Sequence, residues 1–466
     1  MERVAENAAA TDRSHSFELR LARRPTPGRA TRRVSEVGIR FGIPLFASDA
    51  TLLNPTRVSI EPGRIALLTG PSGSGKSSAL AEVERQAGGA CVVDRVSFPR
   101  DAAIIDGIAP WGEMKEAISW LTACGIGEPR LWLRRFEELS DGERFRAKLA
   151  RGLALHSRCG GGVPLICDEF CSNLHRRLAR AISLNLHKLA ARRRLNIFLA
   201  CCNDDVAAEL RPQYILRLTG NGRCGVERPS WPRGRRARLL RSLRIERGSR
   251  RDYGDFAAMH YRSGDELGFV DKVFRVRQRA GSDTLGIVVY CHSPLNLRLR
   301  NEATAGRFCG DARRLNRELR ILRRLVVHPD VRGCGVGHYL VRRTLPLVGT
   351  PFVECLAGMG EFNPVFEKAG MTRVGQYEVS RRCRAALDEL KSMDVNPNGR
   401  DFVLQVCRMP GVRAIVAGVV YRWYRATTGG GEWRVARQSP ERLAHTFRSL
   451  LGSRPMYYLW KRRDAA

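Results

Sequence analysis

Three features that many proteins rely on are missing from this chain: long apolar runs, closely spaced cysteine pairs, and enough acidic residues to balance the arginines. The longest apolar run, Ala414–Tyr421, is far below the roughly 18 residues that a membrane-spanning helix needs. The 14 cysteines include no C-x-x-C pair, which argues against the usual zinc-binding and thioredoxin-like spacings. The first residues, Met1–Glu6, have no apolar leader, so we expect a cytoplasmic protein whose cysteines are reduced.

The charge is strongly one-sided. Lys and Arg total 80 against 47 Asp and Glu, which gives a net charge of +33 and a pI near 10.7. A basic field of this size favours polyanions such as nucleic acid. Most of the positive charge is arginine, however, and GC-rich coding produces the same bias without a polyanionic ligand. Contact with nucleic acid and plain compositional bias therefore both remain open.

A chain of 466 residues is long enough for two or three domains. Residues 1–35 are polar, rich in arginine and without hydrophobic periodicity, so we predict that they are disordered. Residues 36–227 alternate short apolar strands with helical patterns, which predicts an α/β domain with a parallel sheet covered by helices. The predicted strands are Arg64–Thr69, Ala90–Val93, Pro164–Cys167, Asn196–Cys201 and Tyr214–Leu218.

An arginine-rich segment, Arg228–Arg251, interrupts this alternation and contains Glu246 as its single opposing charge. Its prolines and glycines are typical of a boundary between domains, and we place a linker at 228–242. The segment is either a solvated connector or a strip that binds polyanions.

Residues 243–395 have the mixed pattern of an α+β domain, and residues 396–466 form a basic, aromatic C-terminal extension. Strands are predicted at Leu243–Ile245, Val273–Val276, Thr284–Cys291, Ile321–Val327, Phe352–Ala357 and Val374–Val379. Helices are predicted at Asp252–Tyr261, Gly335–Leu347, Asn363–Ala369 and Ser380–Lys391. In the C-terminal extension we predict strands at Phe402–Val406, Ala414–Tyr424 and Met456–Lys461, and a helix at Pro440–Leu451.

The segment from Gly70 to Ser77 reads G-x-x-x-x-G-K-[ST] and lies between a predicted strand and a predicted helix. In this context the glycines let backbone N–H groups converge on the phosphates of a nucleoside triphosphate, and Lys76 neutralises the β- and γ-phosphates. Ser77 is then a ligand of Mg²⁺. The pattern predicts a site for ATP and Mg²⁺ at Gly70, Ser72, Gly73, Ser74, Gly75, Lys76, Ser77 and Ser78.

Two further motifs follow this P-loop in an order and spacing that characterise one family. Leu139–Glu143 (LSDGE) precedes a helical pattern, and an apolar strand ends at Asp168-Glu169. The region resembles the nucleotide-binding domains of ABC ATPases. The resemblance implies that Asp168 binds Mg²⁺, that Glu169 polarises the attacking water, and that both act with Lys76 as the catalytic residues.

The same resemblance implies a head-to-tail homodimer, because Ser140 and Gly142 of one protomer would contact the γ-phosphate held by the other. Three positions depart from the family's pattern. His175 stands where an aspartate is usual, Asn203 stands where a switch histidine is usual, and no glutamine occurs at residues 97–101. We therefore expect ATP binding with slow or conditional hydrolysis, and no role in transport.

A second glycine-rich turn, from Arg332 to Gly337 (RGCGVG), also lies between a predicted strand and a predicted helix. This turn and the downstream Asn363–Met371 resemble two motifs of the GNAT acetyltransferases. The resemblance covers residues 243–380 and implies an acetyl-CoA site, where glycines let backbone N–H groups approach the pyrophosphate. The residues implied are Val327, Arg332, Gly333, Gly335, Gly337, His338 and Asn363.

The acid–base residues of this second site stay open. The family often uses a tyrosine as general acid where this chain has Phe366, which cannot donate a proton. Glu318 and Glu354 are candidate bases, although ordinary surface or strand-edge positions explain them as well. His328 is either a catalyst or a turn residue.

Together the two resemblances point to a small family of ABC-type ATPases fused to a predicted acetyltransferase domain. One hypothesis is an N-acetyltransferase that is gated by ATP binding and dimerisation and has an unknown acceptor. A second is an ATP-dependent protein associated with nucleic acid, which would use the linker and the aromatic and basic runs at Val420–Arg425 and Tyr457–Arg463. A third is a sensor that binds ATP and acetyl-CoA without turnover.

Overall fold

The computed structural model describes residues 15–23, 31–42, 50–160, 162–220, 223–232, 238–260, 267–279, 281, 283–428, 432–452 and 454–462. The chain forms two compact units. Unit 1 comprises Met1–Leu243 and Val327–Val336, and unit 2 comprises Arg244–Val326 and Gly337–Ala466. The short segment Val327–Val336 thus belongs to unit 1, although the residues on either side of it belong to unit 2.

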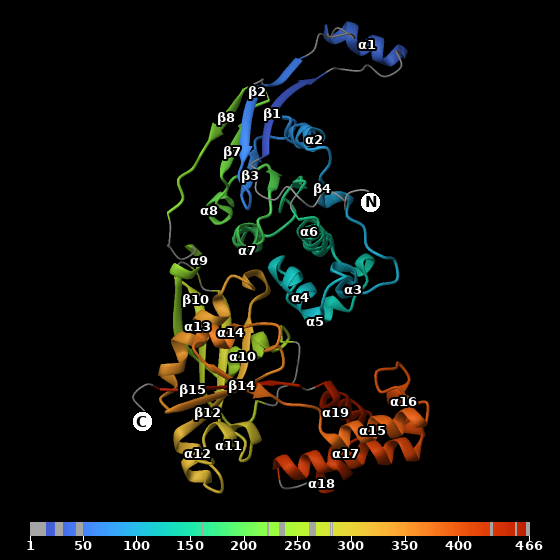
Figure 1. The fold of residues 1–466 in the computed structure, drawn as a ribbon, viewed down its shortest axis with the longest axis vertical. Coiled ribbons are helices and arrows are strands. Elements are labelled where there is room, and N and C mark those ends of the chain that lie inside the picture. Colours follow the sequence, from blue (N-terminus) through green and yellow to red (C-terminus); the bar gives the residue numbers. More distant parts are fainter. Residues whose placement is uncertain are drawn as a thin grey trace. The chain divides into compact units, whose positions relative to one another are not determined.

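Unit 1 is built on a six-stranded sheet with the order β4-β5-β6-β3-β7-β8, of which β3, β4, β7 and β8 are labelled in Figure 1. The strands are β3 Ile65–Thr69, β4 Cys91–Val92, β5 Leu165–Cys167, β6 Ile197–Cys201, β7 Tyr214–Leu218 and β8 Cys224–Glu227. Neighbouring strands from β4 to β7 are parallel, and β8 is antiparallel to β7. Every residue of β3, β5 and β6 is buried, as parallel strands covered on both faces require. The five predicted strands are confirmed.

The helices of unit 1 lie before, between and after these strands in the chain. The α-helices are α1 Arg32–Phe41, α2 Lys76–Gln86, α3 Ile104–Ile108, α4 Met114–Ala123, α5 Pro129–Trp132, α6 Asp141–Arg158, α7 Arg176–Arg193, α8 Ala207–Leu210 and α9 Arg238–Arg241, and the 3-10 helices are η2 Val93–Arg95, η3 Phe136–Glu138 and η4 Pro329–Val331. Helix α2 buries Ala79, Leu80 and Val83 in a core that it shares with β3 and β6. This burial fixes the first turn of α2, and with it Lys76, at the end of β3.

The prediction of disorder for residues 1–35 is wrong for part of that segment. Strand β1 His15–Arg23 pairs antiparallel with β2 Ala50–Ile60. Phe17 and Leu19 are buried in the core of unit 1 with Val58 of β2, while Glu18 between them is exposed. Phe17, Leu19 and Leu21 alternate with Glu18 and Arg20, a strand pattern that the polar, arginine-rich composition of the whole segment outweighed in the prediction. Residues 1–14 lie outside the described part of the chain.

Unit 2 contains a seven-stranded mixed sheet with the order β14-β15-β13-β12-β11-β10-β9. The strands are β9 Leu243–Gly248, β10 Val270–Gln278, β11 Thr284–Cys291, β12 Leu319–Val327, β13 Phe352–Ala357, β14 Thr372–Gln376 and β15 Met456–Lys461. Strands β12 and β13 are parallel, whereas β10–β11, β13–β15 and β14–β15 are antiparallel pairs. All six strands predicted within residues 243–395 are present.

The two parallel strands of this sheet separate toward their carboxyl ends. Pairing between β12 and β13 runs from Leu319 opposite Phe352 to Leu322 opposite Cys355. Beyond that point β12 continues to Val327 and β13 to Ala357 with no further register between them. The backbone edge of the second half of β12 is therefore not paired with β13.

Short helices complete this part of unit 2. They are α10 Arg250–Ala257, α11 Arg298–Ala303, α12 Ala312–Glu318, α13 Val336–Thr344, α14 Val365–Ala369 and the 3-10 helix η5 Leu345–Val348. Helix α10 buries Tyr253 and Phe256 in a core with Val273 and Ile287 of the sheet. This packing places the N-terminus of α10, at Arg250, beside the β10–β11 pair.

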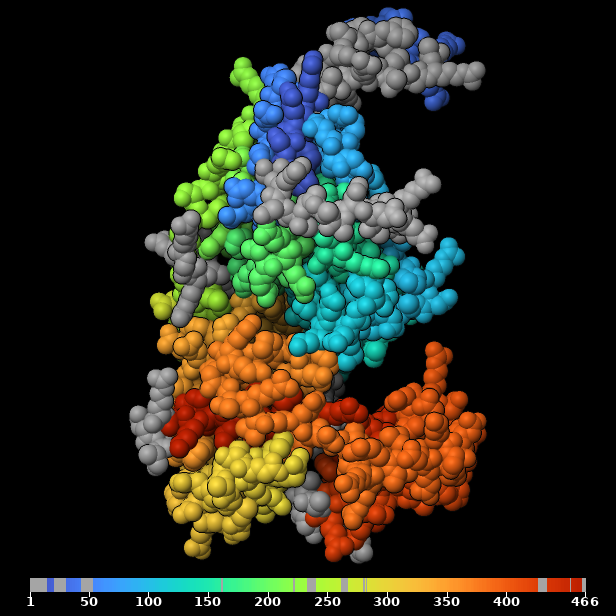
Figure 2. Space-filling view, viewed as in Figure 1, coloured from blue at the N-terminus to red at the C-terminus, as the bar shows by residue number. Residues whose placement is uncertain are grey.

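A helical lobe lies between β14 and β15 in the chain and appears in orange and red in Figure 2. Its helices are α15 Arg381–Ser392, α16 Phe402–Arg408, α17 Pro410–Thr428, α18 Glu432–Ala436 and α19 Pro440–Gly452. The strands predicted at Phe402–Val406 and Ala414–Tyr424 are wrong, because both segments are helical. Val412, Val416 and Val420 are fully buried at a spacing of four residues, which is close to one helical turn and places them on one face.

The predicted helix at Pro440–Leu451 and strand at Met456–Lys461 are confirmed. Strand β15 lies between β13 and β14 in the sheet of unit 2. The C-terminal region is therefore part of unit 2, where the sequence analysis treats it as an extension.

No single helix of the described residues is long and apolar enough to cross a membrane. Helices α16 and α17 reach the necessary length and composition only as a pair, and they are bent by 105° relative to each other. The apolar residues of this pair supply much of the lobe's own core.

Candidate functional site

The carboxyl ends of four neighbouring strands meet at one edge of the unit 1 sheet. The register pairs Thr69 of β3 with Cys201 of β6, and Cys167 of β5 with Leu199 of β6. Because parallel strands end on the same side, the segments that follow β3, β4, β5 and β6 gather at this edge. These segments carry the glycine loop after Thr69, Asp94, the pair Asp168 and Glu169, and Asn203.

The first glycine loop has a backbone that only glycine adopts without strain. Gly70, Gly73 and Gly75 have φ values of +150°, +78° and +94°. A Cβ on Gly70 would lie 2.1 Å from the carbonyl oxygen of Leu218 and 2.9 Å from Oγ of Ser74, so no side chain fits there. Gly75 is the N-cap of α2, which leaves the first N–H groups of that helix directed at the loop.

Lys76 and Ser74 supply polar groups to the same loop. Nζ of Lys76 donates to the carbonyl oxygens of Gly70 and Pro71, both at 2.8 Å, so the ammonium lies across the loop. Ser74 is buried, and its Oγ has no hydrogen-bond partner among the described residues. A phosphate oxygen would satisfy this hydroxyl, so the loop fits the phosphates of a nucleoside triphosphate. The other predicted contacts, Ser72, Ser77 and Ser78, are exposed.

Carboxylates gather where β4 and β5 end. Asp168 is half-buried, and its Oδ1 accepts a hydrogen bond of 2.9 Å from the backbone N–H of Glu169. Glu169 is exposed and has a φ of +46°, an unusual value for a non-glycine residue. Burial raises the pKa of Asp94, the charge of Lys148 lowers it, and the nearby charge of Asp168 raises it. Asp94 is thus a neighbour of Asp168 that the sequence analysis missed.

A cation at this edge would need ligands from outside the protein. In the part of the chain that the structure describes, no group of three or more His, Cys, Asp or Glu side chains is arranged to hold a metal ion. Mg²⁺ is usually held by one or two carboxylates together with waters and substrate phosphates. Asp168 and Ser77, with Asp94 nearby, fit that pattern and not a closed protein cage.

The signature segment begins helix α6. The backbone N–H of Ser140 donates to Oε2 of Glu143 at 2.9 Å, which is half of a capping box. Ser140 is exposed, so the N-terminus of this 18-residue helix faces outward and can receive an anion. A Cβ on Gly142 would lie 3.1 Å from Cδ2 of Leu174, so α6 begins against the segment that follows Glu169.

His175 and Asn203 occupy the two altered motif positions. Nδ1 of His175 accepts a hydrogen bond of 3.4 Å from the backbone N–H of Arg177, which makes His175 the N-cap of α7. Asn203 follows β6, and its neighbours are held by ion pairs: Asp204 lies 2.5 Å from Arg217, and Asp205 binds Nε of Arg176 at 2.9 Å. Neither position carries the residue type that the ABC ATPase pattern predicts there.

The second glycine-rich loop packs against helices of unit 1. Val331 and Cys334 are fully buried there. A Cβ on Gly333, whose φ is +80°, would lie 2.5 Å from Nδ2 of Asn185 in α7 and 3.3 Å from the carbonyl oxygen of Thr122 in α4. The same Nδ2 is 3.5 Å from the carbonyl oxygen of Arg332. Gly333 is thus required by a protein neighbour, which the sequence analysis did not foresee.

The other side of this loop is more open. Gly335, Gly337 and His338 are partly exposed, and Gly335 has a φ of +97°. They precede or begin the nine-residue helix α13. Nε of Arg332 donates to the carbonyl oxygen of Val327 at 3.0 Å. Asn363, which belongs to the second predicted motif, is exposed. The roles of these residues at acetyl-CoA stay predictions.

Both candidate bases of unit 2 have structural roles. Glu318 lies within 3.8 Å of Arg307, Arg314 and Arg317. Burial raises the pKa of Glu318, but these arginines lower it by more, so the pKa lies below its usual value. Glu354 is fully buried, and Oε1 lies 3.3 Å from Nη1 of Arg300. Burial raises the pKa of Glu354, and Arg300 opposes the shift. Neither carboxylate is at the separated ends of β12 and β13.

His328 and Phe366 are also explained locally. Nδ1 of His328 accepts a hydrogen bond of 3.3 Å from the backbone N–H of Asp330, so this side chain caps η4. Phe366 is buried, and its ring centroid lies 5.2 Å from that of Tyr458 on β15. The hydroxyl of Tyr458 donates to Oε1 of Glu367 at 3.0 Å, so it is committed to a buried contact.

No family model matches the chain, and no curated protein matches it. Among solved structures, the dimeric ATP-binding cassette MJ0796 bound to ADP and Pi is 16% identical over 46% of this chain and 98% of its own, with a TM-score of 0.34. CbiO1 from Clostridium perfringens, part of an ABC transporter complex, is 16% identical over 38% of this chain and 82% of its own, with a TM-score of 0.31. A bacterial Atm1-family ABC exporter with ATP bound is 17% identical over 46% of this chain and 39% of its own, with a TM-score of 0.32. At these TM-scores the likenesses carry no argument about function.

Proposed function

We propose that unit 1 is an ABC-type ATPase module that binds MgATP and works as a homodimer. The observation that carries this proposal is the shared strand edge, where the glycine loop with Lys76 meets Asp168 and Glu169. The outward N-terminus of α6 at Ser140 adds the signature element, which would act on ATP held by a second copy.

The residues of this edge divide the chemistry between them. Lys76 would exchange the carbonyls of Gly70 and Pro71 for the β- and γ-phosphates of ATP. Asp168 and Ser77 would hold Mg²⁺, which supplies positive charge to the phosphates when bound. Glu169 would orient the attacking water and accept its proton. Asn203 offers an uncharged amide where a histidine is usual, so we expect slow hydrolysis.

The dimer provides the sharpest test of this module. Glu169→Gln removes the proton acceptor but keeps the phosphate contacts, so ATP should accumulate in a closed dimer. Light scattering with and without MgATP should show a doubling of mass for this variant. A matched variant, Glu137→Gln in η3, should behave as wild type. A Glu169→Gln protein that stays monomeric at saturating MgATP would contradict the action of Ser140 and Gly142 across a dimer.

We further propose that unit 2 is a GNAT-like domain that binds acetyl-CoA and transfers the acetyl group to an acceptor amine. Support comes from the mixed sheet, in which β12 and β13 are parallel and part at their carboxyl ends. The glycine loop and α13 directly follow the unpaired half of β12. The resemblance implies that a pyrophosphate would meet the backbone N–H groups of Gly335 and Gly337, next to the start of α13.

The structure narrows the chemistry that unit 2 can perform. Glu318 and Glu354 are held in ion pairs, and Phe366 cannot donate a proton. Proton transfer from the acceptor amine would therefore pass to water. The transfer itself forms a carbon–nitrogen bond to the acetyl carbon, breaks the thioester bond, and leaves the CoA thiolate to take up a proton. We expect a slow enzyme.

Calorimetry with acetyl-CoA tests this second proposal. Replacing Gly335 and Gly337 by Val should remove acetyl-CoA binding, since the side chains block backbone approach to the pyrophosphate. Gly281→Val, whose Cβ would meet nothing within 4 Å, is the matched control. MgATP binding should persist in both variants. If the unmodified protein binds no acetyl-CoA, unit 2 is not an acetyltransferase, whatever unit 1 does.

A further inference from the structure

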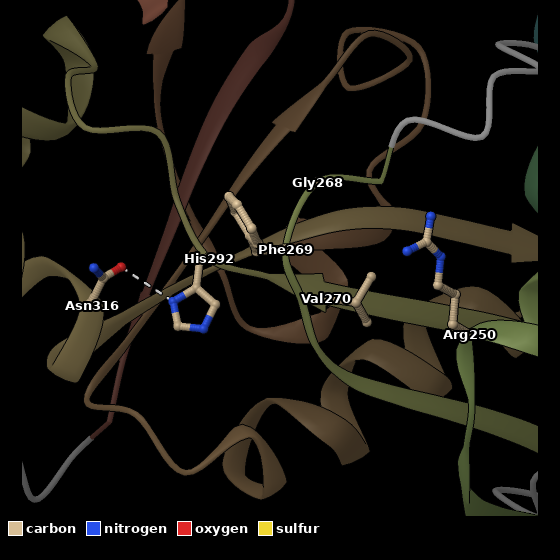
Figure 3. Close-up of a pocket in the computed structure, with 6 residues that line it drawn as sticks. All are labelled: Arg250, Gly268, Phe269, Val270, His292 and Asn316. Atoms are coloured by element: carbon tan, nitrogen blue, oxygen red, sulfur yellow. Dashed lines mark hydrogen bonds between the residues drawn. The ribbon is translucent and has the colours of Figure 1, made fainter.

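One pocket of unit 2 is unrelated to either proposed site. It is an open depression of about 680 Å³ and is lined by Arg250, Gly268, Phe269, Val270, His292 and Asn316. Figure 3 shows His292 and Asn316 at one end, Arg250 at the other, and Phe269 with Val270 between them. Nδ1 of His292 lies 3.2 Å from Oδ1 of Asn316. An aromatic ring, an amide, an imidazole and a guanidinium thus share one concavity.

Phe269 is the unusual member of this set. Its side chain is 83% exposed, although burial of a phenylalanine is normally favourable by about 1.5–3 kcal/mol. No described aromatic ring stacks on it. Most of the ring is therefore accessible to a planar ligand.

The backbone around Phe269 is nevertheless held in place. Leu267 is buried, and its carbonyl oxygen accepts a hydrogen bond of 3.2 Å from Sγ of Cys291. The carbonyl oxygen of Phe269 accepts one of 2.9 Å from the backbone N–H of His292. Gly268, with φ of +78°, makes the turn between them. A ring on such a fixed segment loses little freedom on binding, which favours it as a binding residue over a disordered surface side chain.

Arginines are prominent around the pocket. Among the described acids nearby, Asp252 lies 2.7 Å from Arg275, and Asp271 lies 2.9 Å from Arg320. Burial raises the pKa of Cys291 to about 11, and the charges of Arg323, Arg324 and Arg250 oppose that shift. These three arginines are thus close enough to Cys291 to act on its thiol.

Three arginines at the end of the arginine-rich segment are exposed near the pocket. Arg247, Arg250 and Arg251 are exposed, and no ion pair to a carboxylate is found for them within the described residues. They end the arginine-rich segment Arg228–Arg251, of which residues 233–237 lie outside the described part. Within the described residues, Arg247, Arg250 and Arg251 thus bring positive charge to this region without a carboxylate partner.

We propose that this pocket binds one nucleotide of a single-stranded nucleic acid. The base would stack on the open face of Phe269, and Asn316 with His292 would hydrogen-bond to its edge. Arg250 would hold the adjoining phosphate, and Arg247 and Arg251 would follow the strand beyond it. An acidic peptide would explain the arginines, but it leaves an exposed ring beside an amide without a role.

Fluorescence anisotropy of labelled single strands on the full-length protein, across a salt series, tests this site. Phe269→Ala should weaken binding by about 5- to 100-fold at every salt concentration and leave the salt slope unchanged, since stacking releases no counterions. Phe269→Trp should restore the affinity. Arg250→Gln should instead reduce the log–log salt slope by about one unit. RNA and DNA strands of matched sequence distinguish the two sources of the base.

The controls separate this site from general basic attraction. Leu347→Ala removes another exposed apolar side chain of unit 2 and should leave binding unchanged. Duplex competitors should displace the strand poorly, because their bases are not free to stack. Wild-type affinity in Phe269→Ala, equal competition by duplex, or binding of acidic peptides without any binding of single strands would each overturn the proposal. The result is independent of whether acetyl-CoA binds.

Discussion

The two glycine loops are alike in sequence and differ in what surrounds their glycines. At Gly70 the close neighbours are the backbone of Leu218 and the hydroxyl of Ser74, and Lys76 spans the loop. At Gly333 the close neighbours are the side-chain amide of Asn185 and a helix carbonyl. The first loop is shaped as a cradle, whereas part of the second is shaped for packing. A glycine pattern predicts that something approaches the backbone closely, but not what approaches.

The largest expected effect is on the first loop. Lys76→Ala should lower affinity for a fluorescent ATP analogue by about 100-fold or more, because the phosphates lose their charge-assisted contacts. Lys115→Ala, an exposed lysine on α4, is the matched control and should bind as wild type. Acetyl-CoA binding should not change in either variant. Retained ATP affinity in Lys76→Ala would remove the contrast between the two loops.

The packing role of the second loop predicts an intermediate effect. Gly333→Ala should destabilise unit 1 by about 2–3 kcal/mol, since the new Cβ meets Asn185 and the φ is unfavourable. Gly160→Ala, with a φ of +65° and nothing within 4 Å, should cost only about 1 kcal/mol. Urea unfolding measures the loss of stability in both variants. The transition of unit 1 is the one that shifts when an ATP analogue is added.

A double variant sharpens this result. Asn185→Ala should recover part of the loss in Gly333→Ala, because it removes the atom that the new Cβ would meet. Strictly additive losses would mean that the contact is not the reason for the glycine.

The smallest effect concerns a buried base found in unit 1. His156 is fully buried, its Nε2 lies 2.7 Å from the carbonyl oxygen of Val163, and burial lowers its pKa to about 4. The unfolded chain binds a proton near pH 6.5 and the folded chain does not, so stability falls as the pH drops from about 6.5 toward 4.

Between pH 7 and pH 5 this group should cost unit 1 about 2 kcal/mol. His156→Gln keeps a side-chain donor and cannot titrate, so its urea midpoint should depend less on pH by that amount. Equal pH dependence of the two proteins in the ATP-sensitive transition would contradict the prediction. It would show that folding does not lower the pKa of His156.

Local patterns predicted most strands and the P-loop, because apolar runs and glycine spacing act over a few residues. They failed at α17, where the β-branched residues of Ala414–Tyr424 favour a strand. Packing of Val412, Val416 and Val420 on one face overrides that preference. Asp94 and Asn185 were missed for a different reason. Their importance comes from neighbours 74 and 147 residues away, Asp168 and Arg332, which no local pattern contains.

The place of β15 in the sheet also decides when unit 2 can fold. The gap between β13 and β14 is filled by Met456–Lys461, which is made about 80 residues after β14. The helical lobe has its own core and can form while the chain is still being synthesised. The sheet of unit 2 cannot be completed before β15 is synthesised, because one edge of β13 and one of β14 stay unpaired until then. A ribosome-bound chain that ends before Met456 should therefore expose β13 and β14 to chaperones or to aggregation.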